Sequence, residues 1–198
     1  MQKFILNYPS IPVLAVGFTR THSILARLIQ FFRGGLEDPS LPNHAFLIVD
    51  FNGQKFAAEE TLEGLKMNSL EEYVYPDSRL VAMYYWHGWD DPVKKQAALN
   101  RIAYILREQG NKDTRLGKYQ LLGLLSFVPI FKKFFSADAS GKEAEWCSED
   151  CAAIHKNQGQ CSWMGDIHMA PDQLMYKMQG IEKSMGMEEC NAVLKYYL

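Results

Sequence analysis

Residues 44–61 read HAFLIVDFNGQKFAAEET, and this stretch decides the fold. Two β-type runs flank Asn52-Gly53, a dipeptide that is the strongest short-range signal for a two-residue hairpin turn. The first run is apolar at consecutive positions, which indicates a strand whose sheet is covered on both faces. The sequence therefore predicts an antiparallel β-hairpin buried within the fold.

The turn determines which side chains of the hairpin meet. With Asn52-Gly53 as its two central residues, His44 faces Thr61, and Glu59 lies one diagonal step from His44 on the same face. Glu60 points to the opposite face, so we expect Glu59 rather than Glu60 to contact the imidazole. Thr61 is a weaker candidate for that contact.

The rest of the chain carries both helical and β-type patterns. Apolar residues recur at helical spacing in several segments, and glycine or proline bounds most of them. We expect strands at 13–19 and 79–86, helices at 22–33, 91–110, 147–156 and from Pro171, a short helix opened by a capping box at 69–72, and a partly helical segment at 121–135.

The composition limits the class of protein. The 198 residues are 47% hydrophobic and 22% charged, which suits one globular domain with a sizeable core. A net charge of -2 argues against a non-specific nucleic-acid binder. No apolar run approaches the roughly 18 residues that span a bilayer, and the first residues are too polar for a secretory signal. We therefore expect a cytoplasmic protein.

Cys147 is the candidate nucleophile. It stands where a polar stretch gives way to a predicted helix, and the partial positive charge of a helix N-terminus favours a thiolate. His44 is the candidate base and Glu59 the carboxylate that would orient it. Acidic residues near the cysteine, including Glu149 and Asp150, oppose the thiolate, so the histidine must outweigh them.

A metal site is the competing interpretation of the same helix. Cys147, Cys151 and His155 recur every four residues, and Cys161 follows, which is a plausible zinc set by residue type. However, Cys147 and His155 are separated by about 12 Å along a straight helix, too far to share one ion. We therefore expect no metal and no other cofactor, and we expect Cys151, Cys161 and Cys190 to be buried apolar side chains.

Three short motifs resemble a known family. They are NHAFLIV at 43–49, AEETLEGL at 58–65 and WCSE at 146–149, with further landmarks at 117–119 and 170–174. Their order and spacing are similar to those of the circularly permuted, NlpC-like papain-fold cysteine hydrolases, in the YiiX-like branch related to lecithin–retinol acyltransferases. The histidine precedes the cysteine, as the permutation requires.

The resemblance implies a fold and a set of roles. It implies an α+β, permuted papain-like domain over 1–198, with an antiparallel sheet or small barrel packed against helices. The core would lie at about 20–175 and be followed by a C-terminal helical tail. Cys147 would be the nucleophile, His44 the base and Glu59 the third member of the triad.

The function expected from these features is hydrolysis of an amide. The substrate would be a small peptide-like or acyl-amide molecule, cleaved through an acyl-enzyme. Two alternatives stay open: an acyltransferase or lipid hydrolase using the same residues, and a non-catalytic binding module on this fold. Membrane contact through the apolar residues at 127–135 is not favoured, and the aromatic stretch 86–89 is expected to pack rather than to line a groove. The sequence leaves open the oligomeric state and whether 136–145 is a lid.

Overall fold

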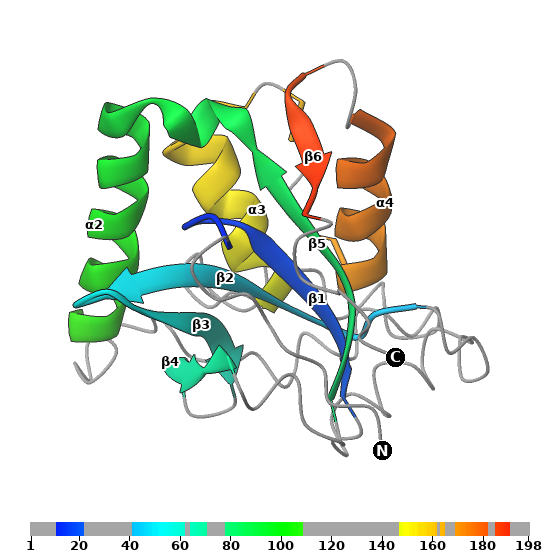
Figure 1. The fold of residues 1–198 in the computed structure, drawn as a ribbon, viewed down its shortest axis with the longest axis horizontal. Coiled ribbons are helices and arrows are strands. Elements are labelled where there is room, and N and C mark those ends of the chain that lie inside the picture. The colour runs from blue at the N-terminus through cyan, green and yellow to red at the C-terminus, as the bar shows by residue number, and fades with distance from the viewer. Residues whose placement is uncertain are drawn as a thin grey trace, which may run out of the picture.

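The described residues form one antiparallel sheet with helices packed against it (Figure 1). In the computed structural model these residues are 11–21, 41–61, 64–70, 78–108, 147–161, 163–164, 169–181 and 185–190. The predicted helix at 22–33, the segments 117–119 and 121–135, the loop 136–145 and the second half of the capping box at 69–72 lie outside them.

Six strands make up the sheet, in the order β4-β3-β2-β1-β5-β6. Every neighbouring pair is antiparallel. Within the described residues the sheet is open, with β4 and β6 at its edges, rather than a closed barrel. The strands are β1 (Val16–Thr21), β2 (His44–Phe51), β3 (Gln54–Thr61), β4 (Gly64–Ser69), β5 (Ser78–Trp86) and β6 (Met187–Glu189).

The predicted hairpin is confirmed by β2 and β3. Asn52 and Gly53 both have positive φ, 54° and 80°, as a type I′ turn requires. The backbone N–H of Gly53 also donates to Asp50 Oδ1 at 2.9 Å, which closes the turn. The central residues of β2, 45–49, are all buried, so both faces of this strand are covered as expected.

The helices begin where the sequence predicts. A short 3-10 turn, η3 (His87–Asp90), follows β5 and leads into α2 (Pro92–Glu108). Asp91 caps α2, because its Oδ1 accepts a hydrogen bond from the Val93 N–H at 2.9 Å. The described residues also contain the helices α3 (Cys147–Asn157) and α4 (Pro171–Ile181).

The start of α4 explains one of the landmark motifs in physical terms. Pro171 occupies the first helical position, where a missing N–H costs nothing. Gln173 accepts a hydrogen bond from the Ala170 N–H at 3.0 Å, as in half of a capping box. The pattern at 170–174 is therefore a helix-start signal in its own right.

Helix α3 occupies the middle of the helical layer. It packs against β2 and β3 and touches α2 and α4, while α4 packs against β5 and β6. In Figure 1, α3 lies behind β1 and β2, with α2 and α4 on either side of it. Within the described residues, no helix is long and apolar enough to cross a membrane.

The α+β class and the antiparallel sheet are confirmed, whereas a permuted papain-like topology stays a prediction. Two strands were not predicted, β4 and β6. The sheet also extends beyond the expected core at both ends, from Val16 to Glu189. The C-terminal region consequently contributes a strand as well as a helix, since β6 pairs with the carboxyl end of β5.

Candidate functional site

His44 and Glu59 contact each other across the hairpin, as the register predicts. His44 opens β2 and Glu59 lies near the end of β3, and the strand pairs from Phe51–Gln54 to Leu47–Ala58 have the expected register. His44 Nε2 is hydrogen-bonded to Glu59 Oε2, and the two side chains are only 14% and 10% exposed. The predicted contact is confirmed, and the catalytic roles of the two residues stay predictions.

Asn68 extends this pair to a third strand. It lies on β4, and its Nδ2 donates a hydrogen bond to Glu59 Oε1. Each oxygen of the Glu59 carboxylate therefore has a partner, His44 on one side and Asn68 on the other. Sequence reasoning missed Asn68 because it missed β4.

The helix that begins at Cys147 packs against the two strands that carry His44 and Glu59. The side chain of Cys147 lies outside the described residues, so its distance to the imidazole stays untested. The last turn of α3 can be located, because His155 lies against Trp86 and Trp89, with ring centroids 6.3 and 5.1 Å apart. Trp86 is the last residue of β5, and Trp89 lies in the 3-10 turn η3 that follows it.

The strand register places the C-terminal end of α3 relative to His44. β1 pairs Val16 with Tyr84 near the carboxyl end of β5, where α3 ends. It pairs Thr19 with His44 toward the other end of the sheet. Helix α3 therefore ends away from His44 along the sheet, and it contacts both strands that carry His44 and Glu59.

The first turn of α3 is buried. Ser148, Glu149 and Asp150 are 1%, 4% and 7% exposed, and the Ser148 hydroxyl donates to the carbonyl oxygen of Met169 in front of α4. The two carboxyl groups stabilise the helix N-terminus. Their effect on a thiol at Cys147 stays a prediction from the sequence.

The His155 side chain is buried, and both of its ring nitrogens are hydrogen-bonded within the protein. Its Nδ1–H donates to the Cys151 carbonyl at 2.8 Å, and its Nε2 accepts from the Trp89 indole N–H at 3.2 Å. Burial lowers the pKa of His155 to about 4, which fits a neutral ring. Burial likewise raises the pKa of the Cys161 thiol to about 12. Cys151 and Cys161 are buried free thiols, whereas Cys190 is only partly buried.

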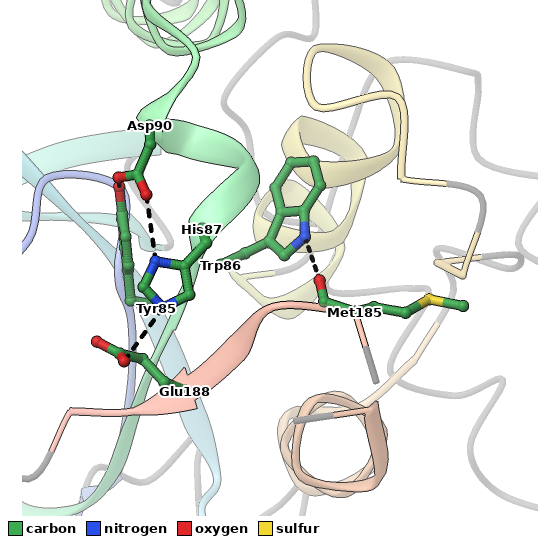
Figure 2. A network of polar contacts seen from close by, with 6 residues as sticks. All are labelled: Tyr85, Trp86, His87, Asp90, Met185 and Glu188. Carbon is green, nitrogen blue, oxygen red and sulfur yellow. Dashed lines mark hydrogen bonds and ion pairs between the residues drawn. The ribbon is translucent and has the colours of Figure 1, made fainter. Parts of the chain in front are cut away.

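Trp86 and Trp89 of the aromatic stretch 86–89 are packed in the core, as expected. The exposed His87 between them belongs to a polar network (Figure 2). His87 lies between two carboxylates, with Nδ1 3.2 Å from Asp90 Oδ2 and Nε2 3.1 Å from Glu188 Oε2. These contacts raise the pKa of His87. Tyr85 donates to Asp90 at 2.8 Å, and its pKa is raised by burial first and by Asp90 second. This network joins η3 to β6.

Comparisons with known proteins yield one distant structural similarity. No family model matches the chain, and no curated protein matches it. One similar solved structure is that of the metalloprotein YiiX from Escherichia coli O157:H7, described as DUF1105, with 14% sequence identity and a TM-score of 0.49. The match covers 89% of this chain and 86% of that one. Similarity at this level establishes neither family membership nor activity.

Proposed function

We propose that this protein is a cysteine-dependent hydrolase that cleaves an amide through an acyl-enzyme on Cys147. The observation that carries the proposal is the hydrogen bond between His44 Nε2 and Glu59 Oε2, made by two largely buried side chains. A histidine with a carboxylate partner has the geometry needed for a base and its orienting group, which supports these roles for His44 and Glu59. The helix that packs on the same two strands begins with a cysteine.

The contact assigns different tasks to the two nitrogens of His44. Because Nε2 is held by Glu59, Nδ1 is the nitrogen that would take the proton from Cys147. Glu59 would hold the ring in place and stabilise the imidazolium that results. The three roles are nucleophile for Cys147, general base and acid for His44, and orienting carboxylate for Glu59.

The proposed reaction proceeds in two halves. The Cys147 thiolate attacks the carbonyl carbon of the substrate, and the oxyanion accepts a hydrogen bond from the Cys147 N–H at the helix start. The His44 imidazolium then gives its proton to the amine as the C–N bond breaks, which leaves the acyl-enzyme. A water molecule loses a proton to His44 and attacks the acyl carbon. The C–S bond breaks, the acid leaves and the thiol recovers its proton.

The substrate class would be a small peptide-like molecule or an acyl amide. An acyltransferase or lipid hydrolase would share the first half of this reaction and differ in the substrate or in the acceptor of the acyl group. Supplying water alone and water with an amine to the acyl-enzyme separates hydrolysis from transfer. A binding module that has only the fold would form no acyl-enzyme.

The pH dependence of thiol alkylation tests the proposal. Iodoacetamide labelling of Cys147, followed by mass spectrometry of its peptide, is measured between about pH 5 and pH 9 in wild type and in His44→Ala. We expect labelling of the wild type well below the ordinary cysteine pKa of about 8.5, and a shift toward that value in the variant. Cys161 and Cys190 contribute little labelling because burial raises both pKa values to about 12.

His87→Ala is the matched control, because His87 also has carboxylate partners but belongs to the network that joins η3 to β6. Its labelling profile should equal that of the wild type. If Cys147 of the wild type titrates near the ordinary value of about 8.5 and His44→Ala changes nothing, the proposed function is wrong. After incubation with an activated ester, we also expect an acyl group on Cys147 of the wild type and none in Cys147→Ser. This result would support the acyl-enzyme mechanism.

A further inference from the structure

The Glu59 carboxylate is held by two side chains that approach it from opposite strands. Its Oε2 bonds to His44 of β2 and its Oε1 to Asn68 of β4. Because a carboxylate has no proton to donate, the Asn68 atom that faces it must be the amide nitrogen. The three side chains form one chain of hydrogen bonds across three neighbouring strands.

The strand register shows that the three hydrogen-bonded side chains lie along a diagonal of the sheet. Asn68 is paired with Ala57, whereas Glu59 is paired with Lys66, so Asn68 reaches Glu59 along a diagonal of the β3–β4 ladder. Glu59 reaches His44 along a diagonal of the β2–β3 ladder in the same way. Residues two apart on a strand share a face, and diagonal neighbours lie within reach of long side chains. The strand geometry therefore presents Asn68 to the carboxylate directly.

The amide has a definite electrostatic effect. Glu59 is only 9% exposed, and a carboxylate that has lost most of its water needs hydrogen-bond donors to stay ionised. Asn68 supplies such a donor without adding charge. It also limits rotation of the carboxylate, because an oxygen fixed on Asn68 leaves the other directed at His44. An ionised and fixed Glu59 is what stabilises a protonated His44.

We propose that Asn68 is a positioning residue of the Cys147 site, which acts through Glu59 by keeping its carboxylate ionised and directed at the His44 ring. This inference rests on the proposed function. It adds a fourth side chain, from the edge strand β4, to the three that the sequence predicts. Asn68 touches neither the substrate nor the reacting atoms in this role.

A purely structural role for Asn68 gives different results. If the amide only fastens β4 to β3, its loss would lower the free energy of unfolding and leave the titration of His44 and Cys147 unchanged. If it positions Glu59, its loss would weaken the His44 imidazolium and hence the Cys147 thiolate. Titration midpoints therefore separate the two roles, whereas stability alone does not.

The experiment compares wild type with Asn68→Leu, which is close in size and has no donor, with Asn68→Ala as a second variant in case the leucine disturbs folding. Asn68→Gln, which keeps the amide, tests rescue. Asn100→Ala is the matched control, because Asn100 is an exposed asparagine on α2 whose side chain accepts a hydrogen bond from Gln96. The two readouts are the imidazole NMR titration of His44 and the pH profile of Cys147 alkylation.

We expect the leucine and alanine variants to lower the His44 midpoint by about one pH unit. We also expect a roughly tenfold slower alkylation of Cys147 below neutral pH, since one unit is a tenfold change in the charged fraction. The glutamine variant should recover part of both shifts, and Asn100→Ala should show neither.

The outcomes separate this inference from the proposed function. If wild-type Cys147 is activated in a His44-dependent way but both midpoints are unchanged in Asn68→Leu and Asn68→Ala, the role of Asn68 is refuted and the hydrolase proposal stands. If wild-type Cys147 behaves as an ordinary thiol, the proposed function fails. The assignment of Asn68 to a thiol site then fails with it, whatever the His44 titration shows.

Discussion

His155 accepts a hydrogen bond from Trp89 in the interior of the protein, with 3.2 Å between the two nitrogens. The bond joins the last turn of α3 to the 3-10 turn η3, which precedes α2. The second His155 nitrogen donates to the Cys151 carbonyl, so the ring is neutral and its tautomer is set by its partners. Protonation of His155 would remove the acceptor of the Trp89 hydrogen bond, so the folded state is sensitive to acid.

Acid should therefore destabilise the protein through His155. Burial lowers its pKa to about 4, against about 6.5 in the unfolded chain, so the unfolded state binds more protons between these values. Stability is lost as the pH falls through this window. Between about pH 7 and pH 4.5 the loss from this group alone amounts to about 2 kcal/mol.

The contribution is isolated by comparing wild type with His155→Gln, whose side chain offers an acceptor but does not titrate. Urea unfolding of both proteins across the window measures the difference. Other buried carboxyl groups affect both proteins alike, so only the difference in slope belongs to His155. Parallel curves for the two proteins would show that His155 does not carry this acid sensitivity.

His87 should show the opposite pH dependence. Its pKa is raised by hydrogen bonds to Asp90 and Glu188, so the folded state holds the proton more tightly than the unfolded one. The stabilisation is fully present below the unfolded pKa of about 6.5 and is lost as the pH rises through the raised folded value. Because the side chain is 49% exposed, we expect less than about 1 kcal/mol.

Thermal unfolding of wild type and His87→Gln measures this contribution. The melting temperatures should differ most near pH 6 and converge toward pH 9. Added salt should reduce the difference at pH 6, since exposed ion pairs are screened. A gap that widens with rising pH would contradict the assignment of the carboxylate pair to a protonated His87.

Glu59 should influence Cys147, and Glu60 should not. Glu59→Gln removes the negative charge that faces His44 Nε2, so the imidazolium loses its partner and the Cys147 alkylation profile should move up by about one pH unit or more. Glu60→Gln is the matched control, because neighbouring positions of a strand face opposite sides of the sheet. Equal shifts in both variants would mean that net charge, rather than the contact with His44, governs the thiol.

The contact between His44 and Glu59 could be predicted because its causes are local. Asn52-Gly53 requires a turn with two positive φ angles, and that turn fixes the register of everything outward from it. The helix starts at Pro92 and Pro171 were equally local, since proline marks both in the sequence. The start at Cys147 is marked by the end of a polar stretch and by acidic residues in the first turn.

The two strands that the sequence did not predict depend on long-range pairing. β4 reads GLKMNS, which has no β-branched residue, and it is a strand because it pairs with β3. β6 has only three residues and is held by the end of β5, with the Cys190 N–H donating to the Met83 carbonyl at 2.8 Å. Ser69, which looked like a helix cap, is the last residue of β4. Without β4, nothing in the sequence points to Asn68.

Gly17 should not tolerate a side chain, because of the aromatic ring across from it. Gly17 on β1 is paired with Phe46 on β2, and a Cβ at this position would lie 2.2 Å from Phe46 Cζ, in a side chain that is 1% exposed. Gly17→Ala forces the buried ring to move, and we expect it to destabilise the protein by roughly 1–3 kcal/mol.

Gly180→Ala is the matched control, because Gly180 lies in α4 and a Cβ added there would meet no described atom within 4 Å. Alanine there should stabilise the helix by about 0.5–1 kcal/mol. Urea unfolding of both variants tests the pair, and a Gly17→Ala protein as stable as wild type would show that Phe46 can leave this position at little cost.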